Sequence, residues 1–170
     1  MPADLHVDVF DWNFSELPVG HFDIIWASPP CETFSAAARK MIGRHGYTRE
    51  TLEQNILERG VPILRRTELI IDYFQPRLWF IENPQTGRMK DFIFDRPYYD
   101  VDYCRYCDWG LRKRTRVWTN KEGFEPLLCN KACGSFENGK HLMQVNSRGG
   151  GSDRRMRYRI PPQLIYELLA

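Results

Sequence analysis

The stretch that decides the fold is FDIIWASPPC, residues 22–31. Its first six residues form a compact apolar run, and the prolines that follow Ser28 end it, which predicts a buried strand leading into a loop. A second apolar run, Leu78–Ile81, is followed at once by Glu82-Asn83-Pro84. A segment with helical spacing of apolar residues separates the two runs. This order of strand, helix and strand is typical of a parallel α/β sheet.

Two helices are expected between these strands. Thr48 can cap the first helix, which begins near Arg49. We expect Gly60 and Pro62 to interrupt that helix. Pro62 then suits the first turn of a second helix, which reaches about Phe74.

The remaining chain predicts shorter elements. Residues 5–10 alternate between apolar and polar side chains, which predicts a strand that ends in an acidic loop. Residues 101–103 and 115–118 are expected to be strands antiparallel to each other, and residues 162–169 a final helix. Residues 119–152 are rich in glycine and predict loops.

Composition sets limits on the protein class. The chain has 170 residues and a net charge of +2, so we expect one domain covering residues 1–170. No apolar run approaches the roughly 18–20 residues that span a bilayer, and no signal peptide is recognisable, which favours a cytoplasmic protein without membrane contact. Two basic clusters suit a polyanion-binding groove, with solvated surface charge as the alternative. The clusters are Arg112, Lys113, Arg114 and Arg116, and Arg148, Arg154, Arg155, Arg157 and Arg159.

Reactive side chains follow both predicted strands. Cys31 comes just after the first strand and Glu82 just after the second, and open α/β sheets bind ligands beyond the carboxyl ends of their strands. Cys31 is therefore a candidate nucleophile and Glu82 a candidate acid. Arg114 and Arg116 are cations that would lower the pKa of Cys31. The alternatives are a cysteine packed in the core, a helix-capping glutamate and surface arginines.

Five segments resemble, in order, the motifs of cytosine-C5 DNA methyltransferases. Residues 23–31 are similar to the Pro-Cys nucleophile motif, and residues 34–35 match the Phe-Ser that follows it. Residues 80–83 resemble the Glu-Asn motif. Residues 112–116 resemble the Gln-x-Arg-x-Arg motif, with arginine in place of the usual glutamine, and residues 157–162 resemble the late Arg-x-x-x-Pro motif. The compact form is most like family members carried by phages and large viruses.

The resemblance implies a reaction on double-stranded DNA. Cys31 would add to C6 of a cytosine that has been flipped out of the duplex, so that C5 becomes nucleophilic enough to be methylated. Glu82 would hydrogen-bond or protonate N3, and Arg114 and Arg116 would orient Cys31 and the base. Glu32 stands where the family commonly has glutamine, and we expect its charge to point outward. The methyl donor would be S-adenosylmethionine.

The resemblance is incomplete where that cofactor should bind. Asp8 falls where the family places an acidic residue near the cofactor adenine, and we expect Pro30 beside the cofactor as well. The family's glycine-rich turn does not precede Asp8, since the first glycine is Gly20. We therefore expect the Rossmann-like α/β sheet of S-adenosylmethionine-dependent methyltransferases in an N-terminally incomplete form. A split gene, a truncation and a lost cofactor site are the alternatives, and a complementing N-terminal subunit or a homo-oligomer is the expected partner.

Four of the five cysteines form close pairs that suit a tetrahedral structural zinc. The pairs are Cys104 with Cys107 and Cys129 with Cys133. His141 is a reserve ligand, and four free thiols are the alternative. The loop-rich segment has little apolar content to fold it otherwise. We expect a small, loop-rich zinc-knuckle-like insertion within residues 101–145.

Three functions follow from these patterns. The first is transfer of a methyl group from S-adenosylmethionine to C5 of cytosine in DNA through a covalent Cys31 adduct. The second is a catalytically incomplete DNA-binding remnant, or a subunit of a split methyltransferase. The third is the same chemistry on tRNA or a free nucleotide.

Overall fold

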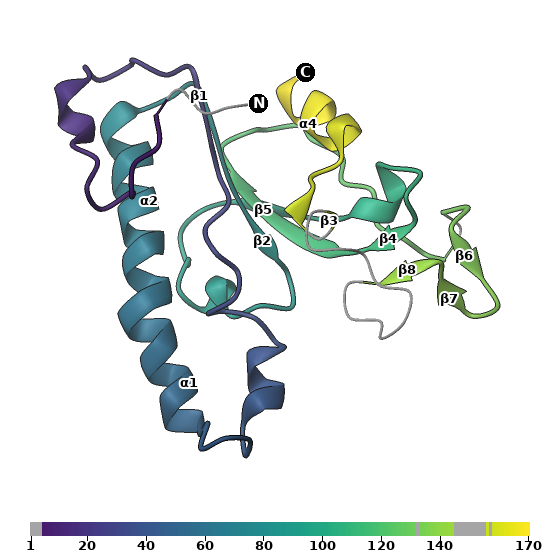
Figure 1. Ribbon diagram of the computed structural model, residues 1–170. Coiled ribbons are helices and arrows are strands. Elements are labelled where there is room, and N and C mark those ends of the chain that lie inside the picture. The colour runs from purple at the N-terminus through teal and green to yellow at the C-terminus, as the bar shows by residue number, and fades with distance from the viewer. Residues whose placement is uncertain (1–4, 132, 145–155, 157) are drawn as a thin grey trace.

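A four-stranded mixed sheet forms the centre of the computed structural model (Figure 1). The structure describes residues 5–131, 133–144, 156 and 158–170. Strand β1 (Ile24–Ala27) lies parallel to β2 (Leu78–Pro84). Strand β5 (Arg114–Thr119) is antiparallel both to β2 and to β3 (Tyr98–Asp102), which gives the order β1-β2-β5-β3. The buried strand β2 and the later antiparallel pair predicted from the sequence are confirmed. The first predicted strand is also present, but it lies at the edge of the sheet and is only partly buried.

One long helical rod covers a face of this sheet (Figure 1). It consists of α1 (Arg49–Asn55), the π-helical turn η3 (Ile56–Gly60) and α2 (Val61–Phe74). Thr48 caps α1 as predicted, because its side chain accepts a hydrogen bond from the amide of Thr51 at 3.2 Å. The predicted second helix, with Pro62 in its first turn and its end at Phe74, is confirmed as α2. The predicted interruption takes the form of a π turn and not of a break in the rod. The backbone widens into a π turn before Pro62 and continues, so the helix absorbs the missing amide donor without breaking.

Side-chain alternation along β2 divides the core into two layers. Trp79 and Ile81 face the rod, where they pack with Leu64 and Ile71. Phe80 faces the opposite side. The apolar residues of that second layer come from the sheet and from helix α4 (Pro162–Leu169), and they are Leu78, Phe80, Val101, Val117, Leu164 and Leu168. The predicted final helix is confirmed, and Glu82 and Asn83 emerge on opposite faces at the end of β2.

The expected strand at residues 5–10 is not present. The Asp8 carboxylate accepts a hydrogen bond from the amide of Phe10 at 2.9 Å, and the chain turns there. Arg66 holds the turn by donating to the carbonyl of Trp12 at 2.8 Å. The Asp8 side chain thus accepts from a backbone amide that would have paired with a neighbouring strand. For this reason the alternating pattern did not produce a strand.

Short elements complete the described chain. Strand β4 (Leu111–Arg112) lies parallel to β8 (Met143–Gln144), and β6 (Phe136–Glu137) pairs with β7 (Lys140–His141) in a hairpin. The short 3₁₀ helices are η1 (Phe14–Glu16), η2 (Ala38–Met41), η4 (Met89–Asp91) and η5 (Tyr103–Arg105). Within residues 119–152, which were predicted to be loop-rich, the described chain forms only short strands such as β6, β7 and β8, in agreement with the prediction. Residues 132 and 145–152 lie outside the described ranges.

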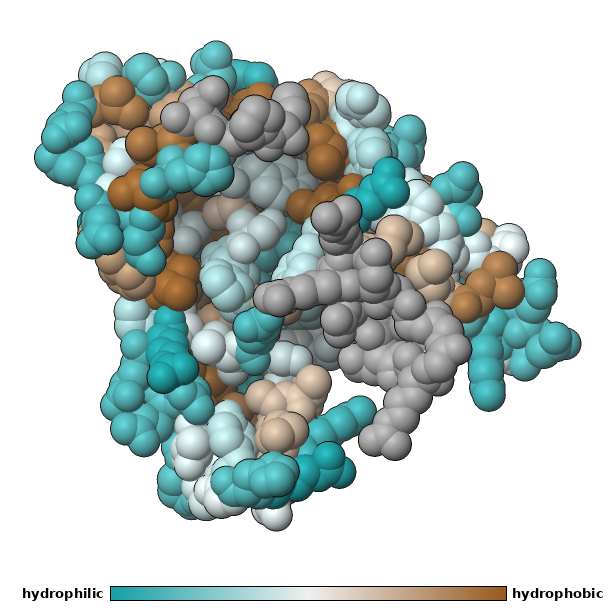
Figure 2. Space-filling view, in the orientation of Figure 1, coloured by the Kyte–Doolittle hydropathy of each residue, from teal (hydrophilic) through white to brown (hydrophobic). Residues whose placement is uncertain are grey.

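The molecular surface is hydrophilic around the β6–β7 hairpin and around the lower end of the rod, whereas apolar residues gather near η1 (Figure 2). None of the helices that the structure describes is long and apolar enough to cross a membrane. Most of the second basic cluster predicted from the sequence lies outside the described residues, namely Arg148, Arg154, Arg155 and Arg157.

Candidate active site

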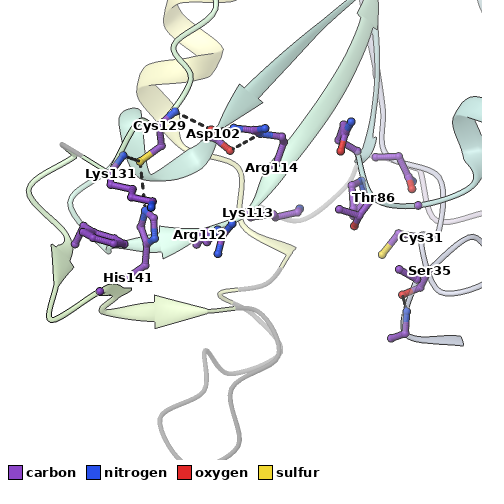
Figure 3. Close-up of a pocket in the computed structure, with 18 residues that line it drawn as sticks. Cys31, Ser35, Thr86, Asp102, Arg112, Lys113, Arg114, Cys129, Lys131 and His141 are labelled. Atoms are coloured by element: carbon purple, nitrogen blue, oxygen red, sulfur yellow. Dashed lines mark hydrogen bonds and ion pairs between the residues drawn. The ribbon is translucent and has the colours of Figure 1, made fainter. Parts of the chain in front are cut away.

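A cavity of about 760 Å³ lies beyond the carboxyl ends of β1 and β2. Cys31 and the segment after β2 form one wall, and the opposite wall comes from β4, the start of β5 and the segment of residues 129–141. Figure 3 shows Cys31 and Ser35 on one side of the cavity, Cys129 and His141 on the other, and Lys113 between them. The sheet thus positions the cavity where parallel strands of an open sheet present ligands.

The loop that carries Cys31 is clamped on both sides of that residue. The side-chain amide of Asn83 donates to the carbonyl of Pro29 at 2.9 Å, and the amide of Arg88 donates to the carbonyl of Phe34 at 2.8 Å. Asn83 and Phe34 are each only 1% exposed. Since one clamp comes from the end of β2 and the other from the segment after it, the parallel pairing of β1 and β2 fixes the half-buried Cys31 against the end of its neighbouring strand.

The surroundings of Cys31 affect its pKa in opposing directions. Burial raises the pKa of the Cys31 thiol most strongly, and the charge of Lys113 lowers it. The negative charge of Glu82 raises it further, as does the weaker effect of Glu32. The net result is a pKa above the usual cysteine value, and Lys113 is the side-chain charge that opposes the rise.

Glu82 lies buried in a hydrogen-bonded group behind this wall. Its Oε1 accepts from the ammonium of Lys113 at 3.1 Å and from the hydroxyl of Tyr103 at 2.9 Å. Glu82 is 6% exposed and Lys113 is 9% exposed. Burial raises the pKa of the Tyr103 phenol well above its usual value, and the negative charge of Glu82 adds to that effect. Tyr103 is therefore a permanent donor to the carboxylate.

The predicted electrostatic role of the arginines needs correction. Arg114 lines the cavity, but its guanidinium binds the Asp102 carboxylate, with Nη2 2.6 Å from Oδ2. Arg116 lies outside the cavity lining, and its Nε is 2.7 Å from an oxygen of Asp100. Each arginine is neutralised by its own carboxylate, so the cation that lowers the Cys31 pKa is Lys113.

The residues expected beside the cofactor do not line this cavity. Neither Asp8 nor Pro30 is part of the lining, and the Asp8 carboxylate is occupied by the amide of Phe10. Glu32 is exposed, as expected from its charge, and its carboxylate accepts a hydrogen bond from the Tyr158 hydroxyl at 2.8 Å. This contact joins the Cys31 loop to a segment 126 residues further along the chain.

Four potential metal ligands converge on the opposite wall. Their ligand atoms all lie within 4.8 Å of one another, and the residues are Cys104, Cys129, Cys133 and His141. The reserve ligand His141 thus takes the place predicted for Cys107. The Cys107 thiol instead donates to the carbonyl of Tyr103 at 3.1 Å, because the η5 turn directs the two cysteines apart.

Lys113, Asp102 and Tyr103 were not singled out from the sequence as site residues. The signal for Lys113 was nevertheless available, since strand alternation places it on the opposite side from Arg112 and Arg114. Asp102 and Tyr103 had no comparable signal, because their roles depend on the pairing of β3 with β5.

Comparison with known proteins identifies a close relative. The chain is 44% identical over 179 aligned residues to the probable DNA (cytosine-5)-methyltransferase of Frog virus 3 (isolate Goorha), and the alignment covers 98% of this chain and 84% of that protein. No protein-family model matches the chain. Similarity of this extent involves the whole fold rather than a short motif.

Proposed function

Because the chain belongs to the cytosine-C5 DNA methyltransferase family, we propose that it methylates cytosine in double-stranded DNA through a covalent bond between Cys31 and C6. The observation that carries the proposal is the position of Cys31 on a cavity wall, at the end of the strand beside the one that bears Glu82. Cys31 lines the cavity and Glu82 lies buried behind the lining, and in this proposal both act on one entering base.

Cys31 acts first. Its thiolate Sγ adds to C6, the C5–C6 double bond opens, and electron density moves toward C5 and the ring nitrogen N3. The ammonium of Lys113 stabilises the thiolate before attack and remains close to the developing charge. After C5 is methylated, loss of the C5 proton allows Sγ to leave and restores the aromatic ring.

Glu82 acts on N3 of the same ring. Lys113 and Tyr103 both donate to Oε1, which keeps the carboxyl group in place and leaves Oε2 for the base. In the base-bound state Oε2 of Glu82 carries a proton. As Sγ adds, N3 becomes more basic and takes this proton, and the proton returns to Oε2 when Sγ leaves. Tyr103 and Lys113 are positioning residues in this scheme.

The methyl donor we propose is S-adenosylmethionine, which supplies an electrophilic methyl group. The described residues do not form a site that fits this cofactor. Asp8 is held in a local turn, and neither Asp8 nor Pro30 lines the cavity. We therefore derive from this chain only the steps performed on the base.

The DNA backbone is expected to contact the cationic rim of the cavity. Arg112 and Lys131 both line the cavity and are exposed, and no salt bridge involves either of them among the described residues. Phosphate contacts of this kind position DNA without reading its sequence. The segment between β5 and β8 is short, so we propose short or relaxed sequence recognition. The viral origin of the relative supports action in the cytoplasm of a host cell.

Trapping with 5-fluorocytosine tests the proposal, because fluorine at C5 cannot leave as a cation and the Sγ–C6 bond therefore persists. Duplex DNA that contains this base should form a denaturation-resistant adduct with the wild-type chain in the presence of S-adenosylmethionine. Cys31→Ser should abolish the adduct, and Cys107→Ser, a matched control outside the cavity, should retain it. An adduct that persists in Cys31→Ser refutes the nucleophile assignment.

A second candidate function is a DNA-binding remnant, or a subunit that depends on another polypeptide for the methyl donor. Two observations favour it: the displaced Asp8 carboxylate, and the position of β1 at an edge of the described sheet. Calorimetry with S-adenosylmethionine separates the candidates. DNA binding without cofactor binding by the isolated chain supports the second candidate, whereas cofactor binding supports the first.

A further inference from the structure

We propose that Cys104, Cys129, Cys133 and His141 bind one structural zinc ion. The proposal does not depend on the methyltransferase reaction, because it rests on the convergence of the four ligand atoms. Two of the residues, Cys129 and His141, lie on the side of the cavity opposite Cys31 (Figure 3). Three thiolates and one imidazole form one of the usual ligand sets of closed, four-coordinate zinc sites.

The geometry of the cluster is close to that of a tetrahedral site. The Nε2 atom of His141 lies 3.5 Å from the Cys104 sulfur and 3.3 Å from the Cys129 sulfur. Tetrahedral zinc with Zn–S bonds of about 2.3 Å and Zn–N bonds of about 2.0–2.1 Å holds sulfur and nitrogen about 3.6 Å apart. Since all four ligand atoms lie within 4.8 Å of one another, only small adjustments separate the observed cluster from a filled site.

Three of the four ligands come from a segment that no hydrophobic core cluster holds. Cys104 lies in η5, Cys129 and Cys133 in the segment after β5, and His141 in the two-residue strand β7. None of the described residues between 125 and 144 belongs to a hydrophobic core cluster. A bound metal replaces such a core, because its binding free energy is available to the folded chain alone.

The imidazole of His141 is oriented for this role. His141 is 8% exposed, and its ring packs edge-on against Phe136, with ring centroids 5.2 Å apart. The hairpin β6–β7 sets this contact by pairing the two residues. Nε2 therefore points at the sulfur atoms without reorganisation of the ring.

The zinc site would also support the active-site wall. The amide of Cys129 donates to Oδ2 of Asp102 at 2.7 Å, and the same carboxylate binds Arg114. Cys129 and His141 themselves line the cavity. Metal binding would therefore fix the position of Asp102 and Arg114 relative to Cys31.

Metal analysis tests the proposal on the full chain expressed with zinc in the medium. We expect about one zinc per chain by inductively coupled plasma mass spectrometry. Cys133→Ser and His141→Ala should lose the bound zinc, and Cys107→Ser should retain it. Zinc that depends on Cys107 but not on His141 overturns the ligand set, and a metal-free wild-type chain, or disulfide-linked peptides from these cysteines, overturns the site.

Cobalt exchange keeps the proposal testable if a variant fails to fold. Replacing zinc with Co²⁺ in the wild-type chain should give the intense visible bands of tetrahedral thiolate coordination, with charge-transfer bands from sulfur. Spectra of an octahedral ion without sulfur ligands overturn the proposal. A chelator should remove the metal and increase amide hydrogen exchange at residues 125–144 relative to the main sheet, and unchanged exchange argues against a structural role.

Discussion

Lys113 and Glu82 form a buried ion pair, with Nζ 3.1 Å from Oε1 and both side chains less than a tenth exposed. Removing one member of such a pair leaves the other charge buried without compensation, at a cost of about 3–5 kcal/mol. We predict this loss in the free energy of unfolding for Lys113→Met, measured by urea denaturation. The double variant Lys113→Met with Glu82→Gln should recover part of the loss. If Lys113→Met lowers the free energy of unfolding by less than the loss of a surface ion pair would, about 1 kcal/mol, the buried pairing is contradicted.

The same lysine controls the reactivity of Cys31. Burial raises the pKa of the Cys31 thiol and Lys113 opposes that rise, so removing the lysine leaves the thiol with a still higher pKa and less thiolate at a given pH. The pH at which iodoacetamide alkylation of Cys31 reaches half its maximal rate should move upward in Lys113→Met. Arg116→Met is the control, because Arg116 is paired with Asp100 and should leave the profile unchanged. A downward shift would contradict the electrostatic assignment.

Dense apolar runs made the centre of the fold predictable. Strand β2 is an apolar run that is buried along most of its length, and its place followed from the sequence. The apolar run of β1 also marked a strand, although that strand is only partly buried. The exposed residues 5–10 had no such constraint, and the side chain of Asp8 converted their alternating pattern into a turn. Periodicity therefore predicted structure where burial enforced it.

Site residues could be predicted only where the pattern that marks them lies within one segment of the sequence. Cys31 and Glu82 were found because each follows an apolar run closely, although Glu82 lies inside β2, which continues to Pro84. The choice between Cys107 and His141 as fourth member of the metal cluster was not accessible, because it depends on how three distant segments converge. The partners of Arg114 and Arg116 likewise depend on the register between β3 and β5.

Gly60 permits the close approach of the Cys31 loop to the helical rod. A Cβ atom at Gly60 would lie 2.7 Å from the Phe34 ring and 2.8 Å from the Thr33 hydroxyl. Gly→Ala in a helix usually stabilises by about 0.5–1 kcal/mol, but here we expect a loss of about 1–3 kcal/mol from overpacking. Urea denaturation measures the change, and Leu57→Ala at an exposed position of the same π turn is the control.

A second substitution tests whether the stability lost in Gly60→Ala comes from a clash with Phe34. Phe34→Leu removes part of the ring that meets the new Cβ, so its combination with Gly60→Ala should cost less than the sum of the two single changes. Because Phe34 follows Cys31 in the same clamped loop, Gly60→Ala should also slow formation of the 5-fluorocytosine adduct. Additive costs for the pair would show that Phe34 and residue 60 do not compete for space.

Asp102 connects the cysteine cluster to the active-site wall. Its carboxylate is 4% exposed and accepts from both Arg114 and the amide of Cys129. In Asp102→Asn the new side-chain NH₂ group cannot accept a hydrogen bond, so it faces either Arg114 or the Cys129 amide without forming one. Each hydrogen bond to a charged group contributes about 1.5–3 kcal/mol. We expect a loss of that size by urea denaturation. Asp100→Asn is the comparison variant, since the Asp100 side chain is 24% exposed against 5% for Asp102 and should cost less to change; equal costs would contradict the bridging role.

Arg112 should bind phosphate at the rim of the cavity. It is exposed, and no salt bridge among the described residues neutralises it, unlike Arg114. Removing one phosphate-binding cation reduces the slope of log K against log salt by about 1, so Arg112→Gln should weaken binding of any duplex and flatten this dependence in fluorescence anisotropy titrations. Arg77→Gln removes an exposed cation at the opposite end of β2 and should leave both quantities unchanged. Equal effects of the two substitutions would mean that DNA binding follows net charge and not the cavity rim.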